Sequence, residues 1–89
     1  MAKRGKLEIM RDILIIIKEN RNSIKITPLI RKSNLSTLRF KEYYQELTNK
    51  NLVTEKTVET NKIVSITEKG LKFLDKYRLI VDFIDEFEL

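Results

Sequence analysis

The sequence predicts an α+β fold that is mainly helical and contains one small β-hairpin. Within the first 50 residues, apolar side chains recur at helical spacing in three short blocks. Between residues 52 and 67 the pattern changes to β-branched residues on both sides of a polar break, which is typical of two strands joined by a turn. Helical spacing then returns and continues almost to residue 89. A chain of 89 residues has room for one hydrophobic core, so we expect a single domain.

The first block predicts a helix from about Leu7 to Glu19. Its inward positions follow the 3.6-residue period and are Met10, Ile13, Leu14 and Ile17. The polar cluster 20–23 ends this helix. Ile24 and Ile26 then alternate with Lys25, which is the period of a short, half-buried strand.

Two further short helices are expected before residue 50. Thr27 is a favourable N-cap and Pro28 suits the first helical position, so the second helix should begin at about Pro28. Residues 33–34 interrupt its pattern, and Ser36 is a second N-cap. The third helix should run from there to about Asn49, with apolar positions at Phe40, Tyr43, Tyr44 and Leu47.

The β-branched region predicts a hairpin whose tip lies near Thr60 and Asn61. Asn61 would supply the positive φ that such a turn needs. Thr67 is expected to cap a last helix over about Glu68–Glu88, which would be about 32 Å long.

Two short helices joined by a tight turn and followed by a two-stranded ribbon form the winged helix-turn-helix pattern. In such a domain the second helix of the pair enters the major groove of double-stranded DNA, and the ribbon touches the backbone or the minor groove. Twelve residues on the predicted short strand, second helix, third helix and hairpin are candidates for DNA contact: Lys25, Arg31, Lys32, Ser36, Thr37, Leu38, Arg39, Lys41, Glu42, Gln45, Lys56 and Lys62.

The chemistry of the third helix divides these candidates into two groups. Arg39, Gln45 and Glu42 carry the donors and acceptors that suit guanine, adenine and cytosine edges respectively. Ser36, Thr37 and Lys41 suit phosphates. The alternative for each side chain is an ordinary solvated surface.

The charge is unevenly distributed along the chain. The net charge is +5, and it divides into +7 over residues 1–62 and −2 over residues 63–89. No basic residue follows Arg78, whereas four acidic residues do. We therefore expect the first part to face a polyanion and the C-terminal part to point away from phosphate.

The last helix carries an apolar repeat of about 3.5 residues, which is typical of a coiled-coil seam. The seam consists of Phe73, Tyr77, Ile80, Ile84 and Phe87, with Val81 beside it. We expect it to form a homodimer with antiparallel helices, because the acidic residues after Arg78 would repel one another in a parallel pair. This divides the chain into a DNA-binding head, residues 1–67, and a dimerisation helix, residues 68–89. The alternative is that the whole seam folds back onto the first helix.

Four parts of the sequence form a recognisable combination: residues 29–36, the third-helix positions Phe40, Tyr43, Tyr44 and Leu47, residues 50–53 and residues 66–74. Together they closely resemble the archaeal winged-helix family of DNA-binding proteins of roughly ten kilodaltons. The resemblance covers about residues 7–80. It implies pairing through a C-terminal antiparallel coiled coil and DNA binding of a chromatin or regulatory type. The sequence departs from the family at Asn51, where glycine is usual, at the apolar Leu38, and in a shorter last helix.

The composition excludes several other functions. The chain has no cysteine and no histidine, which removes the usual ligands for zinc, haem and iron-sulfur clusters, and the components of Ser-His-Asp catalysis. We therefore expect no metal, no cofactor and no enzymatic activity. The longest apolar run, residues 13–17, is far below the ~20 residues that cross a bilayer, so we expect a cytoplasmic, nucleoid-associated protein without a membrane partner. The alternative function is a winged-helix protein–protein interaction module.

Overall fold

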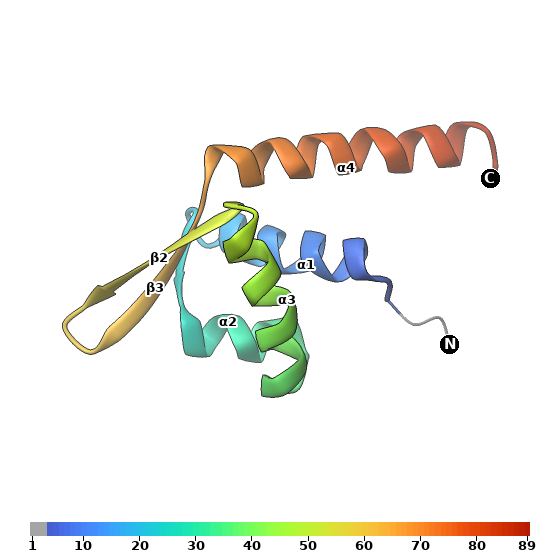
Figure 1. The fold of residues 1–89 in the computed structure, drawn as a ribbon. Helices are drawn as coiled ribbons and strands as arrows, with labels where there is room; N and C mark the ends of the chain where they lie inside the picture. Colours follow the sequence, from blue (N-terminus) through green and yellow to red (C-terminus); the bar gives the residue numbers. More distant parts are fainter. Residues whose placement is uncertain (1–3) are drawn as a thin grey trace.

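The computed structural model describes residues 4–89 and has the expected α+β class (Figure 1). Its helices are α1 (Lys6–Glu19), α2 (Ile26–Ser33), α3 (Thr37–Asn49) and α4 (Glu68–Glu86). Its strands are β1 (Ser23–Lys25), β2 (Val53–Val58) and β3 (Asn61–Ile66).

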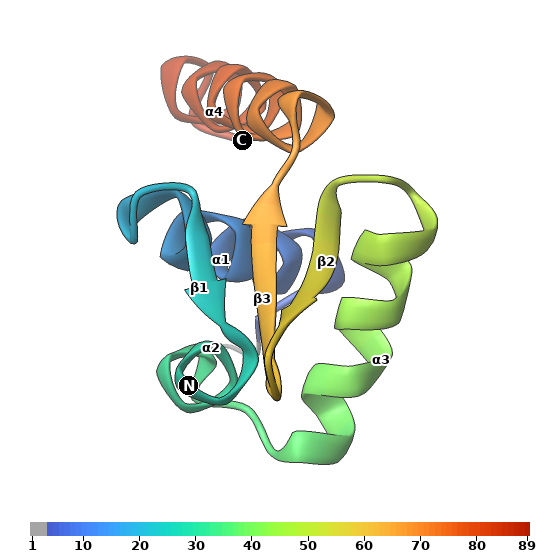
Figure 2. The ribbon, with the colours of Figure 1, turned by 90° about the vertical axis from the view of Figure 1, so that its left-hand side faces the viewer.

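The three strands form one antiparallel sheet in the order β1-β3-β2. Ile24 of β1 lies opposite Val64 of β3, and Val53 of β2 lies opposite Ile66. Figure 2 shows the sheet in front of α1, with β3 in the centre and the hairpin tip pointing away from α4. The short strand that precedes α2 thus joins the hairpin as a third strand.

The core is built around α1. The inward side chains of this helix are at most 1% exposed and are Ile9, Met10, Ile13, Leu14 and Ile17. They pack with Leu29 of α2, with Phe40 and Leu47 of α3, and with the buried residues of the sheet. This packing fixes α2 and α3 at defined positions relative to the hairpin.

The prediction that α2 begins at Pro28 after a Thr27 cap is wrong. The helix begins at Ile26, and the cap position is Lys25, whose side chain makes no capping hydrogen bond. Ile26 packs against the core, so its burial accounts for the earlier start. Pro28 is tolerated in the first turn because the backbone N–H groups there have no partner within the helix.

The hairpin turn also differs from the prediction in one residue. Val58 pairs with Asn61, so the turn consists of Glu59 and Thr60. Glu59, and not Asn61, has the positive φ, at 58°. Asn61 cannot supply it, because the register places this residue in the ladder. After α3, Asn51 stands where the family usually has glycine, and it adopts the left-handed conformation with a φ of 61°.

The start of α4 is fixed by a cap and by a close approach to the sheet. Thr67 is the predicted N-cap: its Oγ1 accepts a hydrogen bond from the backbone N–H of Gly70 at 3.0 Å and donates one to the carbonyl of Asn51 at 2.7 Å. A Cβ atom added to Gly70 would clash with the carbonyl oxygen of Leu52 and would lie 2.7 Å from Cγ1 of Ile66. The glycine is therefore what allows α4 to approach the sheet this closely.

We expect Gly70→Ala to lower the free energy of unfolding by about 1–3 kcal/mol, because a backbone carbonyl must move to admit the methyl group. Chemical denaturation followed by circular dichroism measures this change. The matched control is Gly5→Ala, where nothing lies within 4 Å of the added Cβ and the effect should stay within about 1 kcal/mol. Equal effects at the two glycines would contradict the role of Gly70 in this close approach.

Among residues 4–89, only the first half of α4 is covered by other elements. The helix lies beside α1 and runs in the opposite direction (Figure 1). Leu74 is buried, Phe73 packs against the core, and Tyr77 is half-buried under the Arg11 guanidinium, which lies 5.3 Å from its ring centre. Beyond Arg78, the exposed apolar side chains are Leu79, Ile80, Val81, Phe83, Ile84, Phe87 and Leu89.

Two general features of residues 4–89 bear on function. None of the helices in this part of the chain is long and apolar enough to cross a membrane. Within the same residues, no three histidine, cysteine, aspartate or glutamate side chains are placed to hold a metal ion together.

Candidate nucleic-acid interface

The elements predicted to contact DNA lie together on one side of the molecule. Figures 1 and 2 show α2, the first turn of α3 and the hairpin tip on the side opposite α4. The side chains of all twelve candidate residues are exposed. The fold therefore places the twelve candidate residues away from the acidic C-terminal half of α4.

The first turn of α3 is fixed by its cap and by its inward side chains. Ser36 Oγ accepts a hydrogen bond from the backbone N–H of Arg39 at 3.2 Å, which confirms Ser36 as the N-cap. Phe40 and Leu47 are buried, so the rotation of 100° per residue turns the opposite stripe outward. This outward stripe consists of Leu38, Glu42 and Gln45, and Leu38 is 72% exposed.

Arg39 lies along the flank of α3 instead of pointing straight outward. Its Nη2 donates a hydrogen bond to the Tyr43 hydroxyl at 3.2 Å, and its Cζ lies 5.8 Å from the centre of the Tyr43 ring. Tyr43 is thus a member of this site, although its place in the sequence pattern indicates only an apolar position. The i, i+4 spacing of the two residues is the signal that could have revealed the pair.

Two acidic side chains near the interface are engaged by neighbours. Glu46 lies 2.6 Å from the Lys6 ammonium and 3.9 Å from that of Lys50. Glu55 accepts a hydrogen bond from the Tyr44 hydroxyl at 2.5 Å and lies 3.9 Å from the Lys62 ammonium. These contacts reduce the negative field on the flanks of α3.

Burial of the Tyr44 phenol raises its pKa above the usual range, and the hydrogen bond to Glu55 raises it further. The Tyr44 hydroxyl is the donor in this hydrogen bond. This contact links α3 to β2 and so fixes the hairpin relative to the first turn of α3.

A groove of about 310 Å³ lies between the start of α2 and the hairpin tip. Lys25 and Lys62 line it together with Ile26, Thr27, Pro28, Thr60 and Asn61. The pairing of β1 with β3 brings the two lysines to the same place. Thr60 and Asn61 were expected at the hairpin tip but not as part of this site, because the sequence does not reveal that β1 pairs with β3.

The candidate DNA-contacting residues do not all lie on one face of the hairpin. Lys56 lies opposite Ile63 in the ladder, whereas Lys62 lies opposite Thr57. Since successive residues of a strand point to opposite faces, Lys56 and Lys62 are on different faces of the hairpin. Arg31 and Lys32 are exposed in the last turn of α2, between the buried residues Leu29 and Ser33.

Comparison with known proteins identifies solved structures with a similar fold. The fold is similar to that of Sso10a-2, a DNA-binding protein from Sulfolobus solfataricus: the TM-score is 0.79 and the identity 26%, over 96% of this chain and 86% of that one. It is also similar to AF1382 from Archaeoglobus fulgidus, with a TM-score of 0.69 and 21% identity over 94% of this chain and 91% of that one.

A third similar structure is AbsC, a MarR family transcriptional regulator from Streptomyces coelicolor, with a TM-score of 0.72 and 21% identity over 86% of this chain and 55% of that one. A comparison with curated protein sequences gave no match. The family model for the winged helix-turn-helix matches residues 3–85, nearly the whole chain. The chain therefore belongs to the winged helix-turn-helix family.

Proposed function

We propose that this protein binds double-stranded DNA and acts as a transcriptional regulator or a chromatin-type protein in the cytoplasm, associated with the nucleoid. The observation that carries this proposal is the convergence of α2, the exposed first turn of α3 and the hairpin tip on the side opposite α4. In winged helix-turn-helix domains this is the arrangement that places the second helix of the pair in the major groove.

The proposed contacts follow from the positions of the side chains. Lys25 and Lys62 on their common groove lie where a phosphate backbone would pass beside the hairpin, and Arg31 and Lys32 extend the basic surface along α2. Ser36, Thr37 and Lys41 would contact phosphates at the start of α3. Arg39, Glu42 and Gln45 would reach base edges, with Leu38 between them against an apolar group such as a thymine methyl.

Two further observations support the same function. The structure is similar to Sso10a-2, which is a DNA-binding protein. The positive excess of residues 1–62 supports a polyanionic partner independently of that protein.

The proposal includes a homodimer formed through residues 79–87, which we call the distal segment. Within it, Leu79, Ile80, Phe83 and Phe87 are each more than half exposed. Exposed apolar surface of this extent usually marks an interface. Phe73 and Tyr77, which the sequence places in the same seam, are already partly covered within the chain, so the self-association surface is displaced toward the C-terminal end of α4.

The base-reading part of the proposal is tested by Arg39→Ala and Gln45→Ala. We expect Arg39→Ala to weaken binding and Gln45→Ala to change the preference among duplexes by about 1–3 kcal/mol. Fluorescence anisotropy with a panel of duplexes that differ at single base pairs measures both. To reach a base, Arg39 must give up its hydrogen bond to Tyr43. Tyr43→Phe should therefore change the contribution of Arg39 to DNA binding more than it changes the contribution of Gln45.

Lys72→Ala, an exposed change on α4, is the control and should leave DNA affinity unchanged. If Arg39→Ala and Gln45→Ala weaken binding equally on every duplex, the contacts are to phosphate and the assignment of base readout is wrong. If the folded protein binds no duplex but still self-associates, it is a protein–protein interaction module.

A further inference from the structure

A second and larger groove, of about 500 Å³, lies between α1 and α4 on the side of the molecule away from the proposed DNA surface. Its apolar lining includes Ile15 of α1 with Leu74 and Val81 of α4. Lys18 and Arg78 also line it. The groove thus has an apolar wall from each of two helices.

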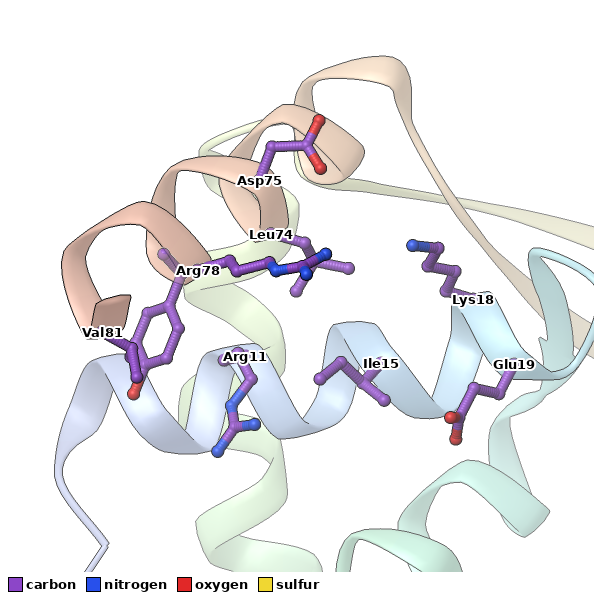
Figure 3. A pocket seen from close by; sticks show the side chains of 9 residues that line it. Arg11, Ile15, Lys18, Glu19, Leu74, Asp75, Arg78 and Val81 are labelled. Carbon is purple, nitrogen blue, oxygen red and sulfur yellow. The ribbon is translucent and has the colours of Figure 1, made fainter. Parts of the chain in front are cut away.

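Basic side chains outnumber acidic ones in this groove. Arg11, Lys18 and Arg78 line it together with Asp75 and Glu19, and in Figure 3 the Arg78 side chain lies along the space between the helices. The ion pairs found among residues 4–89 involve neither Lys18 nor Arg78. The groove therefore presents apolar surface together with two cationic groups that lack an anionic partner within the described chain.

The distal segment has the complementary composition. Six of its nine residues are exposed and apolar, and the other three are Asp82, Asp85 and Glu86. At 100° per residue, the six apolar positions cover an arc of roughly 200°. A two-stranded coiled coil buries only a narrow seam, so an arc of this width requires contact with more than one helix.

We infer that the groove between α1 and α4 receives the distal segment of a second copy of this chain. This inference rests on the proposed homodimer. It adds the surface that receives the distal segment, and α1 forms one wall of that surface. Because each chain carries one groove and one distal segment, a two-fold axis lets both copies insert reciprocally and closes the assembly as a dimer. Val81 belongs to both surfaces, so the axis passes close to it.

Opposite charges also favour insertion of the distal segment into the groove. The acidic Asp82 and Asp85 of one copy approach Lys18 and Arg78 of the other, across an interface from which water is partly excluded. The dimer is then held by a junction of two α1 and two α4 helices, and the two DNA-binding heads remain on its outside.

The test is a pair of charge-reversed proteins studied by sedimentation velocity at low salt. The groove variant is Lys18→Glu with Arg78→Glu, and the segment variant is Asp82→Lys with Asp85→Lys. Each should dimerise roughly a hundredfold more weakly than the wild type, because like charges then meet at both reciprocal contacts. An equimolar mixture should recover dimers, since the heterodimer pairs opposite charges at both contacts.

The matched control is Lys32→Glu with Lys69→Glu, which makes the same charge change at exposed positions of α2 and α4 outside the groove. It should dimerise like the wild type, and circular dichroism confirms that each variant is folded. If the wild type dimerises and the groove variant is unaffected, the groove is not the receiving surface although the homodimer stands. A monomeric wild type overturns both, and neither result decides whether the protein binds DNA.

Discussion

The affinity of the protein for duplex DNA should fall on the order of a thousandfold when the salt concentration is raised from about 50 to about 200 mM. Each phosphate neutralised by a lysine or arginine releases condensed counterions, so the logarithm of the binding constant falls linearly with the logarithm of the salt concentration. A dimer that contacts roughly six to ten phosphates gives a decrease of this size. The exposed basic side chains of α2, α3 and the hairpin can supply that number from two heads.

The slope of the logarithm of the binding constant against that of the salt concentration also identifies which residues contact phosphates. Lys25→Ala should reduce the slope by about one for each phosphate that Lys25 neutralises, with little change in the preference among duplexes. Lys76→Ala on α4 is the control and should leave the slope unchanged. A flat titration for the wild type, or no binding at low salt, would remove DNA as the partner.

Ile80→Asp combined with Ile84→Asp should convert the protein from a dimer to a monomer. Burial of each apolar side chain of this size contributes roughly 1.5–3 kcal/mol, and four or more such side chains on each of two chains outweigh the free-energy cost of association. The substituted carboxylates would be buried without partners, which adds a desolvation penalty. We therefore expect the wild type to remain dimeric at micromolar concentration and the double variant to be monomeric in ultracentrifugation.

Exposed leucines elsewhere on the chain provide the control for this experiment. Leu7→Asp with Leu38→Asp makes the same type of substitution at side chains that are 54% and 72% exposed but lie outside α4. That variant should remain dimeric. A double variant at Ile80 and Ile84 that still dimerises would show that the distal segment is not the interface.

Local sequence signals were sufficient for most of the fold. The spacing of Ile13, Leu14 and Ile17 predicted α1, and Ser36 and Thr67 both act as the N-caps expected of them. These predictions succeeded because they depend on neighbours within one or two turns. The start of α2 was misplaced because burial of Ile26 in the core, a tertiary effect, outweighed the local preference of Thr27 for a cap position.

The candidate interface was predictable as a set of exposed residues but not as a geometry. Helical periodicity placed Leu38, Glu42 and Gln45 on the outward stripe of α3 without any knowledge of the fold. The groove of Lys25 and Lys62 depends on β1 pairing with β3, 38 positions away at the register of Lys25 and Ile63. Long-range pairings of this kind leave no signature at a fixed sequence spacing.

In the last helix, too, the local pattern was predictable from the sequence and the long-range contacts were not. Its 3.5-residue repeat predicted an apolar seam, but the repeat is equally regular in the half that α1 covers and in the half that remains exposed. The position of Tyr77 under Arg11 marks where coverage within the chain ends. The sequence could not locate this boundary, because it depends on how far α1 extends along α4.

Binding of duplex DNA to the face formed by α2, the start of α3 and the hairpin can be observed directly by NMR. The experiment is a titration of the isotopically labelled protein with a short duplex at low salt. We expect backbone amide shifts to change most over residues 25–45 and 56–62 and to stay nearly constant over residues 79–87. Shift changes centred on α4 or on the groove between α1 and α4 would contradict the proposed binding face.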